Sequence, residues 1–357
     1  MPITFLIVAT IGVAGYGAYY FYNTADMFNS NKALYAKLGI ELPRSFEAVG
    51  QASRYLGQLS REPCDNVAMT ALAQLMETAG YPRESAKSLE TYNQGCTVDE
   101  NMLQSAYAAY TRIGDHKSAV RVADELTKLD TASYNYRFMR GTAHERSKDY
   151  KAALADYIST LELFPDLSNV SGSQFYQVSL MYDKLGKPCA AIGPLETFIS
   201  YNVKERHSQQ IAKLISDYSK RGNCAATYAN GSARVILPPT NVVDVTINGT
   251  RARMIIDTGA STVSITQEMA ARVRITPDDT DLVDVKTVGG RMKQAAGYAQ
   301  TIQVADATAA SVPILIAINS KDAFGAGIDG LLGMTFLSRF NATISPGLFE
   351  LKPRTRN

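Results

Sequence analysis

Three stretches of the chain differ in how apolar and polar residues alternate. Residues 2–22 are almost continuously apolar and contain no charged side chain. From about 62 to 222, apolar residues recur at the spacing of helices that bury one face. Beyond residue 233, short runs rich in Val, Ile and Thr alternate with glycine-containing turns, which is the pattern of β-strands. The pattern predicts a long apolar helix, a helical domain and an all-β domain.

The first stretch is long enough to cross a membrane. Residues 2–22 would form about 30 Å of helix, the thickness of a hydrocarbon core. Four tyrosines gather near its end, as aromatic residues do at a membrane interface. No Lys or Arg precedes Lys32, so an uncleaved anchor fits better than a signal peptide, which usually has a basic start. Residues 1–24 are therefore predicted to be a transmembrane anchor, with a signal peptide or a buried soluble helix as alternatives.

The helical region contains a repeat. Gly114–Val120 aligns with Lys148–Leu154 at an offset of 34 residues, and Gly80–Ala86 and Gly186–Ile192 fit the same series. A period near 34 resembles the tetratricopeptide repeat, whose helix pairs bury their apolar faces only by stacking. We expect such repeats over residues 62–223, after a connector at 25–61.

The unit from Tyr134 to Pro165 resembles this family best. Gly141 fits the small residue of the first helix, and Ala153 and Tyr157 fit the second helix. The unit departs from the family at Arg137, where a Trp is usual, and at Thr160, where a small residue is usual. The resemblance implies a concave surface for a peptide or protein partner. A spacer that lifts the β domain off the membrane is the alternative.

The β domain contains a carboxylate at a tight turn. A hairpin is predicted from Val242 to Ile256 around Asn248-Gly249, and its second strand ends directly in Asp257-Thr258-Gly259-Ala260-Ser261. Residues 225–357 contain no His and no Cys, which excludes Ser-His, Cys-His and His-ligated metal chemistry within this domain. The arrangement of strand and turn presents the carboxylate of Asp257 at the mouth of a sheet.

This loop and its surroundings resemble the retropepsin-like aspartic proteases. A helix at Gln267–Val273 follows the loop, and then a hairpin at Val285–Val304 with a glycine tip. The resemblance implies that this hairpin is the flap, with its tip at Val288, Gly289 and Gly290. It also implies that the apolar-apolar-Gly element is Leu331-Leu332-Gly333, followed by a short helix and a closing hairpin that turns at Pro346-Gly347.

The resemblance implies an aspartic endopeptidase that acts as a homodimer. Only one Asp-Thr-Gly is present, and Asp329-Gly330 lacks the hydroxyl residue of a second copy. Two carboxylates must share a proton, so each of two chains would supply its Asp257. The resemblance implies that Thr258 joins the active-site loops of the two chains by hydrogen bonds. Gly259 and the flap would bind substrate backbone, while Ala260 and Ser261 support the loop. No metal or cofactor is expected.

The cysteines help to predict the cellular compartment of the protein. There are four: Cys64, Cys96, Cys189 and Cys224. They form no C-x-x-C pair, so a zinc site is not expected. Their even number suits two structural disulfides in an oxidising compartment, with four free thiols as the alternative. We therefore expect a body in the bacterial periplasm, anchored in the inner membrane. Basic residues just after the apolar span favour a cytoplasmic body, which stays open.

The remaining charges exclude some partners. A net charge of +2 without any Lys/Arg-rich run gives no indication of nucleic acid binding. An acidic cluster at Asp278, Asp279, Asp281 and Asp284 lacks calcium-loop spacing, and we expect a solvated loop there. The sequence predicts a multidomain protein with an all-α solenoid and a C-terminal acid-protease barrel at 233–357. A scaffold protein that binds peptides on its repeats and dimerises through the β domain is the alternative function.

Overall fold

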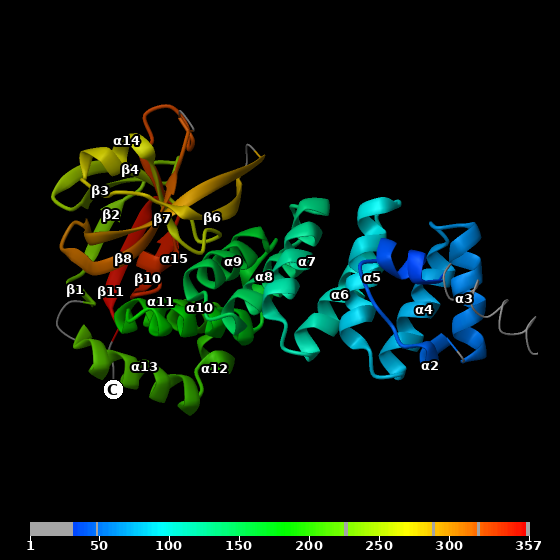
Figure 1. The fold of residues 1–357 in the computed structure, drawn as a ribbon. Coiled ribbons are helices and arrows are strands. Elements are labelled where there is room, and N and C mark those ends of the chain that lie inside the picture. Colours follow the sequence, from blue (N-terminus) through cyan, green and yellow to red (C-terminus); the bar gives the residue numbers. More distant parts are fainter. Residues whose placement is uncertain (1–30, 48, 225–227, 288–289, 320–321, 355–357) are drawn as a thin grey trace, which may run out of the picture. The chain divides into compact units, whose positions relative to one another are not determined.

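The structure, a computed structural model, describes residues 31–47, 49–224, 228–287, 290–319 and 322–354, without the side chains of 279–281 and 287. The chain divides into two compact units, residues 1–129 and 130–357 (Figure 1). The predicted membrane helix at 2–22 lies outside the described residues. Every helix in the described part is too short or too polar to cross a bilayer.

The first unit is all-helical. Its elements after the helical residues 31–37 are α2 (Arg44–Glu47), α3 (Gly50–Arg61), α4 (Asn66–Thr78), α5 (Pro82–Gly95), α6 (Glu100–Arg112) and α7 (His116–Leu129). Helices α4 and α6 begin where Asp65 and Asp99 accept hydrogen bonds from backbone N–H groups of the first turn. A disulfide joins Cys64, before α4, to Cys96, after α5. The bond closes one helix pair at its open end.

The second unit begins with helices that continue the repeat. They are α8 (Tyr134–Arg146), α9 (Tyr150–Leu163), the 3-10 turn η1 (Leu167–Asn169), α10 (Gly172–Lys184), α11 (Pro188–Ser200), α12 (Val203–Arg206) and α13 (Gln209–Gly222). The predicted repeat unit is the pair α8 and α9. A Cβ on Gly141 would lie 2.9 Å from the ring of Tyr157, so the small residue permits the close approach of the two helices. A disulfide joins Cys189 in α11 to Cys224 after α13.

The repeat has a fixed turn geometry between the two helices of a pair. The aligned residues Gly80, Gly114, Lys148 and Gly186 all have positive φ, at 90°, 74°, 65° and 73°. The next helix begins two residues later in each copy, at Pro82, His116, Tyr150 and Pro188. Glycine adopts this left-handed conformation without strain. Lys148 is therefore the strained member of the series.

The β domain of the second unit is a closed sheet. Its strands are β1 (Ala229–Asn230), β3 (Val242–Ile247), β4 (Thr250–Ile256), β5 (Val263–Thr266), β6 (Asp278–Thr287), β7 (Gly290–Val304), β8 (Ala307–Ala317) and β9 (Gly330–Leu332). They are ordered β1-β8-β5-β9-β4-β3-β7-β6, and an additional β7–β8 pairing closes the sheet on itself. Helix α14 (Gln267–Arg272) follows β5 as predicted. The predicted all-β barrel is confirmed.

Alternating side chains of the strands fill the barrel. Val243, Val245 and Ile247 of β3 are buried, while Asp244 between them is exposed. The predicted turn at Asn248-Gly249 joins β3 to β4, and both residues have positive φ. The register of this hairpin therefore places the end of β4 at the edge of the barrel core.

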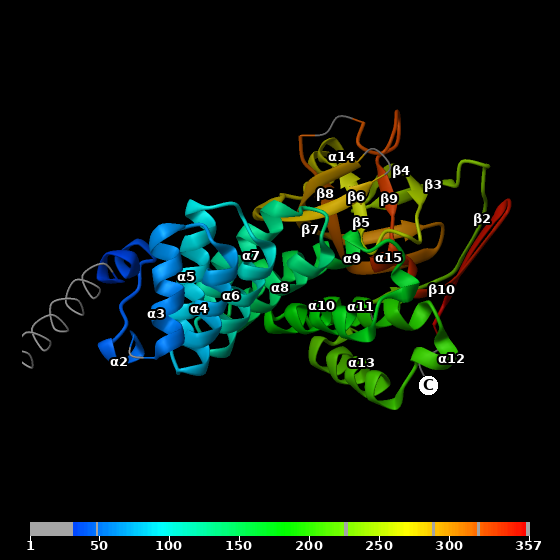
Figure 2. The ribbon, with the colours of Figure 1, turned by 90° about the vertical axis from the view of Figure 1, so that its right-hand side faces the viewer.

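A second, smaller sheet closes the domain. Strands β2 (Ala233–Ile236), β10 (Phe340–Ser345) and β11 (Leu348–Pro353) are ordered β10-β11-β2, and helix α15 (Met334–Leu337) precedes β10. The turn at Pro346-Gly347 is the predicted one. Figure 2 shows this sheet beside the barrel. Phe349 and Leu351 anchor it in the barrel core, while Ile236 is 87% exposed.

Within the second unit, strand β6 lies along helix α9. The backbone N–H of Asp284 donates to the hydroxyl of Ser159 at 2.8 Å, and its carboxylate pairs with Arg137 of α8 at 2.8 Å. Lys151 of α9 pairs with Asp278 at 2.8 Å. The predicted solvated loop is therefore wrong: the acidic segment is a strand, and Asp284 is buried because a helix cation neutralises it.

Candidate active site

Asp257 is held at the end of strand β4. Strand β9 lies between β4 and β5, pairing Ile256 with Leu332, and the N–H of Asp257 donates to the carbonyl of Leu332 at 3.2 Å. The carboxylate Oδ1 accepts from the N–H groups of Gly259 at 2.8 Å and Ala260 at 3.2 Å. The loop thus wraps around the carboxylate of Asp257 and fixes its orientation.

The predicted apolar-apolar-Gly element supports this loop. Leu332 is fully buried beneath it, and Leu331 pairs with Ser264 of β5. A Cβ on Gly333 would collide with the backbone carbonyls of Thr262 and Ala260. The N–H of Met334 donates to the carbonyl of Ala260 at 2.9 Å. A side chain larger than hydrogen at 333 would push the loop away from β9.

The tip of the loop is open on one side. Thr258 and Gly259 are exposed, and Asp257 is half-buried. The hydroxyl of Tyr201, which follows α11, donates to the carbonyl of Thr258 at 3.0 Å. The helical part of the second unit therefore contacts the loop directly. No sequence motif predicts this contact, because Tyr201 and Thr258 lie 57 residues apart.

Ser261 faces inward rather than toward solvent. It is 7% exposed, and its hydroxyl donates to Oε1 of Glu162 at 2.5 Å. Glu162 is a residue of helix α9 with 9% exposure. The pKa of Glu162 is raised to about 7: burial raises it most, hydrogen bonds from Ser261 and Thr262 lower it, and the charge of Asp257 raises it. Sequence analysis missed Glu162, since a Glu between Leu161 and Leu163 carries no motif.

Asp257 and Glu162 line the same cavity, which has a volume of about 660 Å³. One wall comes from the segment after α9, with Phe164 and Pro165. The opposite wall comes from β6 and β7 and from the loop that contains Phe324. A cavity of this size with an apolar lining and a carboxylate can hold several residues of an extended peptide.

The predicted flap is the β6–β7 hairpin. Thr287 pairs with Gly290 at its end, and Gly290 has a φ of 120°. Val288 and Gly289 lie outside the described residues. Val285, Lys286 and Gln294 of the hairpin line the cavity of Asp257. The hairpin therefore forms a wall of the cavity that contains Asp257.

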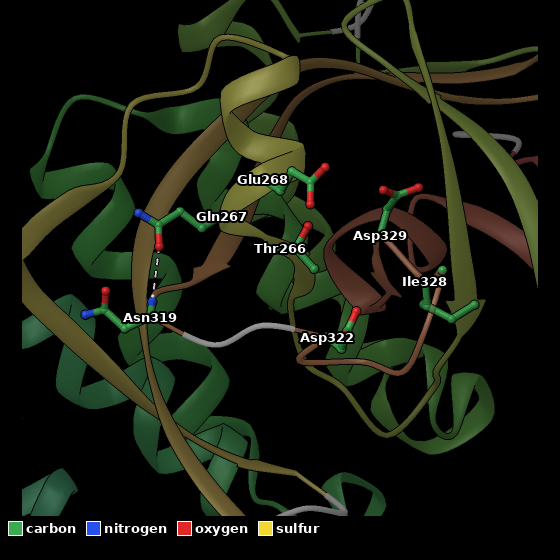
Figure 3. Close-up of a pocket in the computed structure, with 8 residues that line it drawn as sticks. Thr266, Gln267, Glu268, Asn319, Asp322, Ile328 and Asp329 are labelled. Carbon is green, nitrogen blue, oxygen red and sulfur yellow. Dashed lines mark hydrogen bonds between the residues drawn. The ribbon is translucent and has the colours of Figure 1, made fainter.

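A second cavity of about 590 Å³ lies beside α14 and is separate from Asp257 (Figure 3). Its residues Gln267 and Asn319 are joined by a hydrogen bond of 3.1 Å from the N–H of Asn319. Asp329 also lines it, and this carboxylate pairs with Arg272 at 2.8 Å and accepts from the N–H of Arg253 at 2.8 Å. Asp329 is thus engaged in structural contacts that join α14, β4 and β9.

Comparison with known proteins agrees with this geometry. Residues 243–336 match the family model of the aspartyl proteases. Over these residues the chain is similar to the aspartyl proteases. The match contains Asp257, both strands of the β6–β7 hairpin and Leu331-Leu332-Gly333.

Similar proteins each match only part of the chain. An uncharacterized protein in the cobV 5′ region of a Sinorhizobium species is 33% identical over 95 residues, which is 26% of this chain and 38% of that protein. A retropepsin-like aspartic protease from Rickettsia conorii is 21% identical over 34% of this chain and 91% of its own, with a TM-score of 0.26.

Other solved structures are similar to the helical part of the chain. YrrB, described as a tetratricopeptide protein with an unusual peptide-binding site, is 14% identical over 50% of this chain and 88% of its own, with a TM-score of 0.36. MamA from Desulfovibrio magneticus is 19% identical over 43% of this chain and 84% of its own, with a TM-score of 0.34. The part of the chain that is similar to the aspartyl proteases follows the helical part.

Proposed function

We propose that this chain is an aspartic endopeptidase whose catalytic residue is Asp257. The observation that carries the proposal is the carboxylate of Asp257, held by two N–H groups at the wall of a cavity that the flap hairpin borders. In the proposed reaction a carboxylate accepts a proton from water, which attacks the scissile carbonyl. A second, protonated carboxyl group donates a proton to the carbonyl oxygen.

We further propose that the second carboxyl group is Asp257 of another copy, so that the active form is a homodimer. The exposure of Thr258 and Gly259 supports this, because a partner loop could reach them. The exposed side chains of Ile236 and Ile344 support it as well, since they lie on the small sheet whose outer strand β10 has an open edge. Two such carboxyl groups would titrate as one coupled pair.

The proposed place of action is the periplasmic side of a bacterial inner membrane, with residues 1–24 as the anchor. The pairing of all four cysteines in disulfides supports an oxidising compartment. Anchoring two chains in one membrane would raise their effective concentration, so that a weak dimer could suffice. The helical repeats are proposed to recruit the peptide or protein substrate, or a protein partner.

The decisive experiment is cleavage of a peptide library by the full chain in detergent. Asp257→Asn is expected to abolish cleavage, whereas Asp244→Asn, at an exposed position of β3, is expected to retain it. Ile236→Lys is expected to shift the concentration at which activity appears to higher values. Cleavage that survives Asp257→Asn would refute the proposal. A partner that binds the repeats and stays uncleaved by both variants would favour the scaffold function instead.

A further inference from the structure

Helix α9 contributes a carboxyl group to the active-site loop from outside the protease domain. Oε1 of Glu162 accepts the hydroxyl of Ser261 at 2.5 Å, and Thr262 provides hydrogen bonds from both its backbone and its side chain. All three residues are buried, at 9%, 7% and 3% exposure. Ala260, which binds the carboxylate of Asp257, is the residue just before Ser261. A single turn of chain therefore binds both carboxyl groups.

The surroundings of Glu162 favour its neutral form. The charged group that acts on it is Asp257, which repels a second negative charge. Tyr201 lies close to both carboxyl groups, and burial keeps the pKa of its hydroxyl above the ordinary value. Arg206 stacks on the rings of Phe198 and Tyr201, and Lys286 lines the same cavity from strand β6. Burial favours the neutral form of Glu162, and it outweighs the hydrogen bonds from Ser261 and Thr262, which favour the charged form.

We propose that Glu162 is a positioning residue of the active site, whose neutral carboxyl group holds the Ser261–Thr262 end of the catalytic loop against helix α9. This inference rests on the proposed function, because it assigns Glu162 to the same reaction. Loss of the proton places a second negative charge beside Asp257 in a buried position, and this repulsion and desolvation destabilise the packing of the loop against helix α9. The repeat domain is then part of the catalytic apparatus, and cleavage depends on the protonation of Glu162.

The test compares pH profiles of kcat/KM for the full chain on a peptide that it cleaves. Gln resembles neutral Glu in shape and can accept the hydroxyl of Ser261, so Glu162→Gln is expected to retain cleavage at acidic pH within about threefold. It should also extend cleavage by one pH unit or more on the alkaline side. For Glu162→Ala, kcat/KM is expected to fall tenfold or more at every pH. Glu268→Gln, an exposed acid of α14, serves as the matched control with an unchanged profile.

Two outcomes would overturn the assignment. If Glu162→Gln is as inactive as Asp257→Asn at every pH, Glu162 transfers its own carboxyl proton during the reaction and does not act by positioning. If Glu162→Gln and Glu162→Ala both leave kcat/KM and its pH profile unchanged, Glu162 does not position the loop. Thermal unfolding of each variant separates a folding defect from an effect on the folded site.

A second readout does not need cleavage and so separates this inference from the proposed function. Hydrogen–deuterium exchange of residues 257–262, corrected for intrinsic rates, is expected to rise in the wild type between pH 6 and pH 8. It should stay flat in Glu162→Gln. Exchange that rises equally in both would refute the inference, even if Asp257 proves to be catalytic. Exchange that follows the expectation while Asp257→Asn still cleaves would refute only the proposed function.

Discussion

Arg137 of helix α8 and Asp284 of strand β6 form an ion pair, with 2.8 Å between the guanidinium and the carboxylate. Both side chains are buried, at 7% and 12% side-chain exposure. Arg137 stands where the repeat family usually has Trp, so the departure from that pattern has a reason in the fold. Arg137 joins helix α8 to strand β6, in addition to its place in the packing of the repeat.

Removal of Arg137 should destabilise the second unit strongly. Arg137→Leu leaves the carboxylate of Asp284 buried without its counter-ion, which typically costs about 3 kcal/mol or more. Replacement of both residues by Leu should cost less than the single change, because no charge is left behind. Urea unfolding curves measure both effects, and Arg83→Leu, at an exposed pair, should change stability by less than about 1 kcal/mol. A double variant as unstable as the single one would contradict the explanation.

Lys148→Gly should stabilise the pair α8 and α9. Lys148 has a φ of 65° at a position where three aligned copies have glycine. Relief of the left-handed strain is worth about 1 to 2 kcal/mol, and the greater freedom of an unfolded glycine offsets part of it. A net gain of about 0.5 to 1 kcal/mol is expected in thermal or urea unfolding. Lys148→Ala keeps a Cβ and should gain nothing, so an equal gain in both variants would argue against backbone strain.

Gly333→Ala should damage both stability and cleavage. Its new methyl group would overlap the carbonyls of Thr262 and Ala260, so the loop of Asp257 must shift. Overpacking of this kind costs about 1 to 3 kcal/mol. Gly193→Ala in helix α11 is the matched control, because a Cβ there meets nothing within 4 Å. It should leave cleavage unchanged and raise stability slightly, as Ala does in helices.

Reduction of Cys189–Cys224 should lower the stability of the second unit. The bond closes a loop with a sequence separation of 35, for which the loss of unfolded-state entropy predicts about 3 to 4 kcal/mol. The Cys189→Ser/Cys224→Ser variant should show the same loss in melting temperature without reductant. A melting temperature that is insensitive to both changes would contradict a structural role for this disulfide.

The stability of the folded chain should fall as pH rises from about 4.5 to about 7, because of Glu162. Its pKa rises from 4.5 to about 7 on folding, so between these values the folded state holds a proton that the unfolded state has lost. The stabilisation is full below about pH 4.5 and declines until about pH 7, by about 3 kcal/mol in total. Urea midpoints measured from pH 4 to pH 8 test this against Glu162→Gln, which lacks this contribution. Parallel curves for the two proteins would exclude it.

Local pattern determined most of the elements of the β domain. Asn248-Gly249 predicted the β3–β4 hairpin because few other residue pairs accept two positive φ values in a two-residue turn. The end of β4 then placed Asp257 at a sheet edge, and Leu331-Leu332-Gly333 was identified as a separate element of the same fold. The repeat register at Gly80, Gly114, Lys148 and Gly186 was equally visible, since helix period and turn chemistry are local properties.

The tertiary structure alone decided which distant residues meet. Glu162 and Ser261 are 99 positions apart, and Arg137 and Asp284 are still farther apart in the chain. Neither pair carries a sequence motif, because a buried acid or a buried cation becomes favourable only once its partner is in place. The acidic pattern of 278–284 therefore predicts a solvated loop, although Arg137 of α8 and Lys151 of α9 supply the cations that let this segment become a strand.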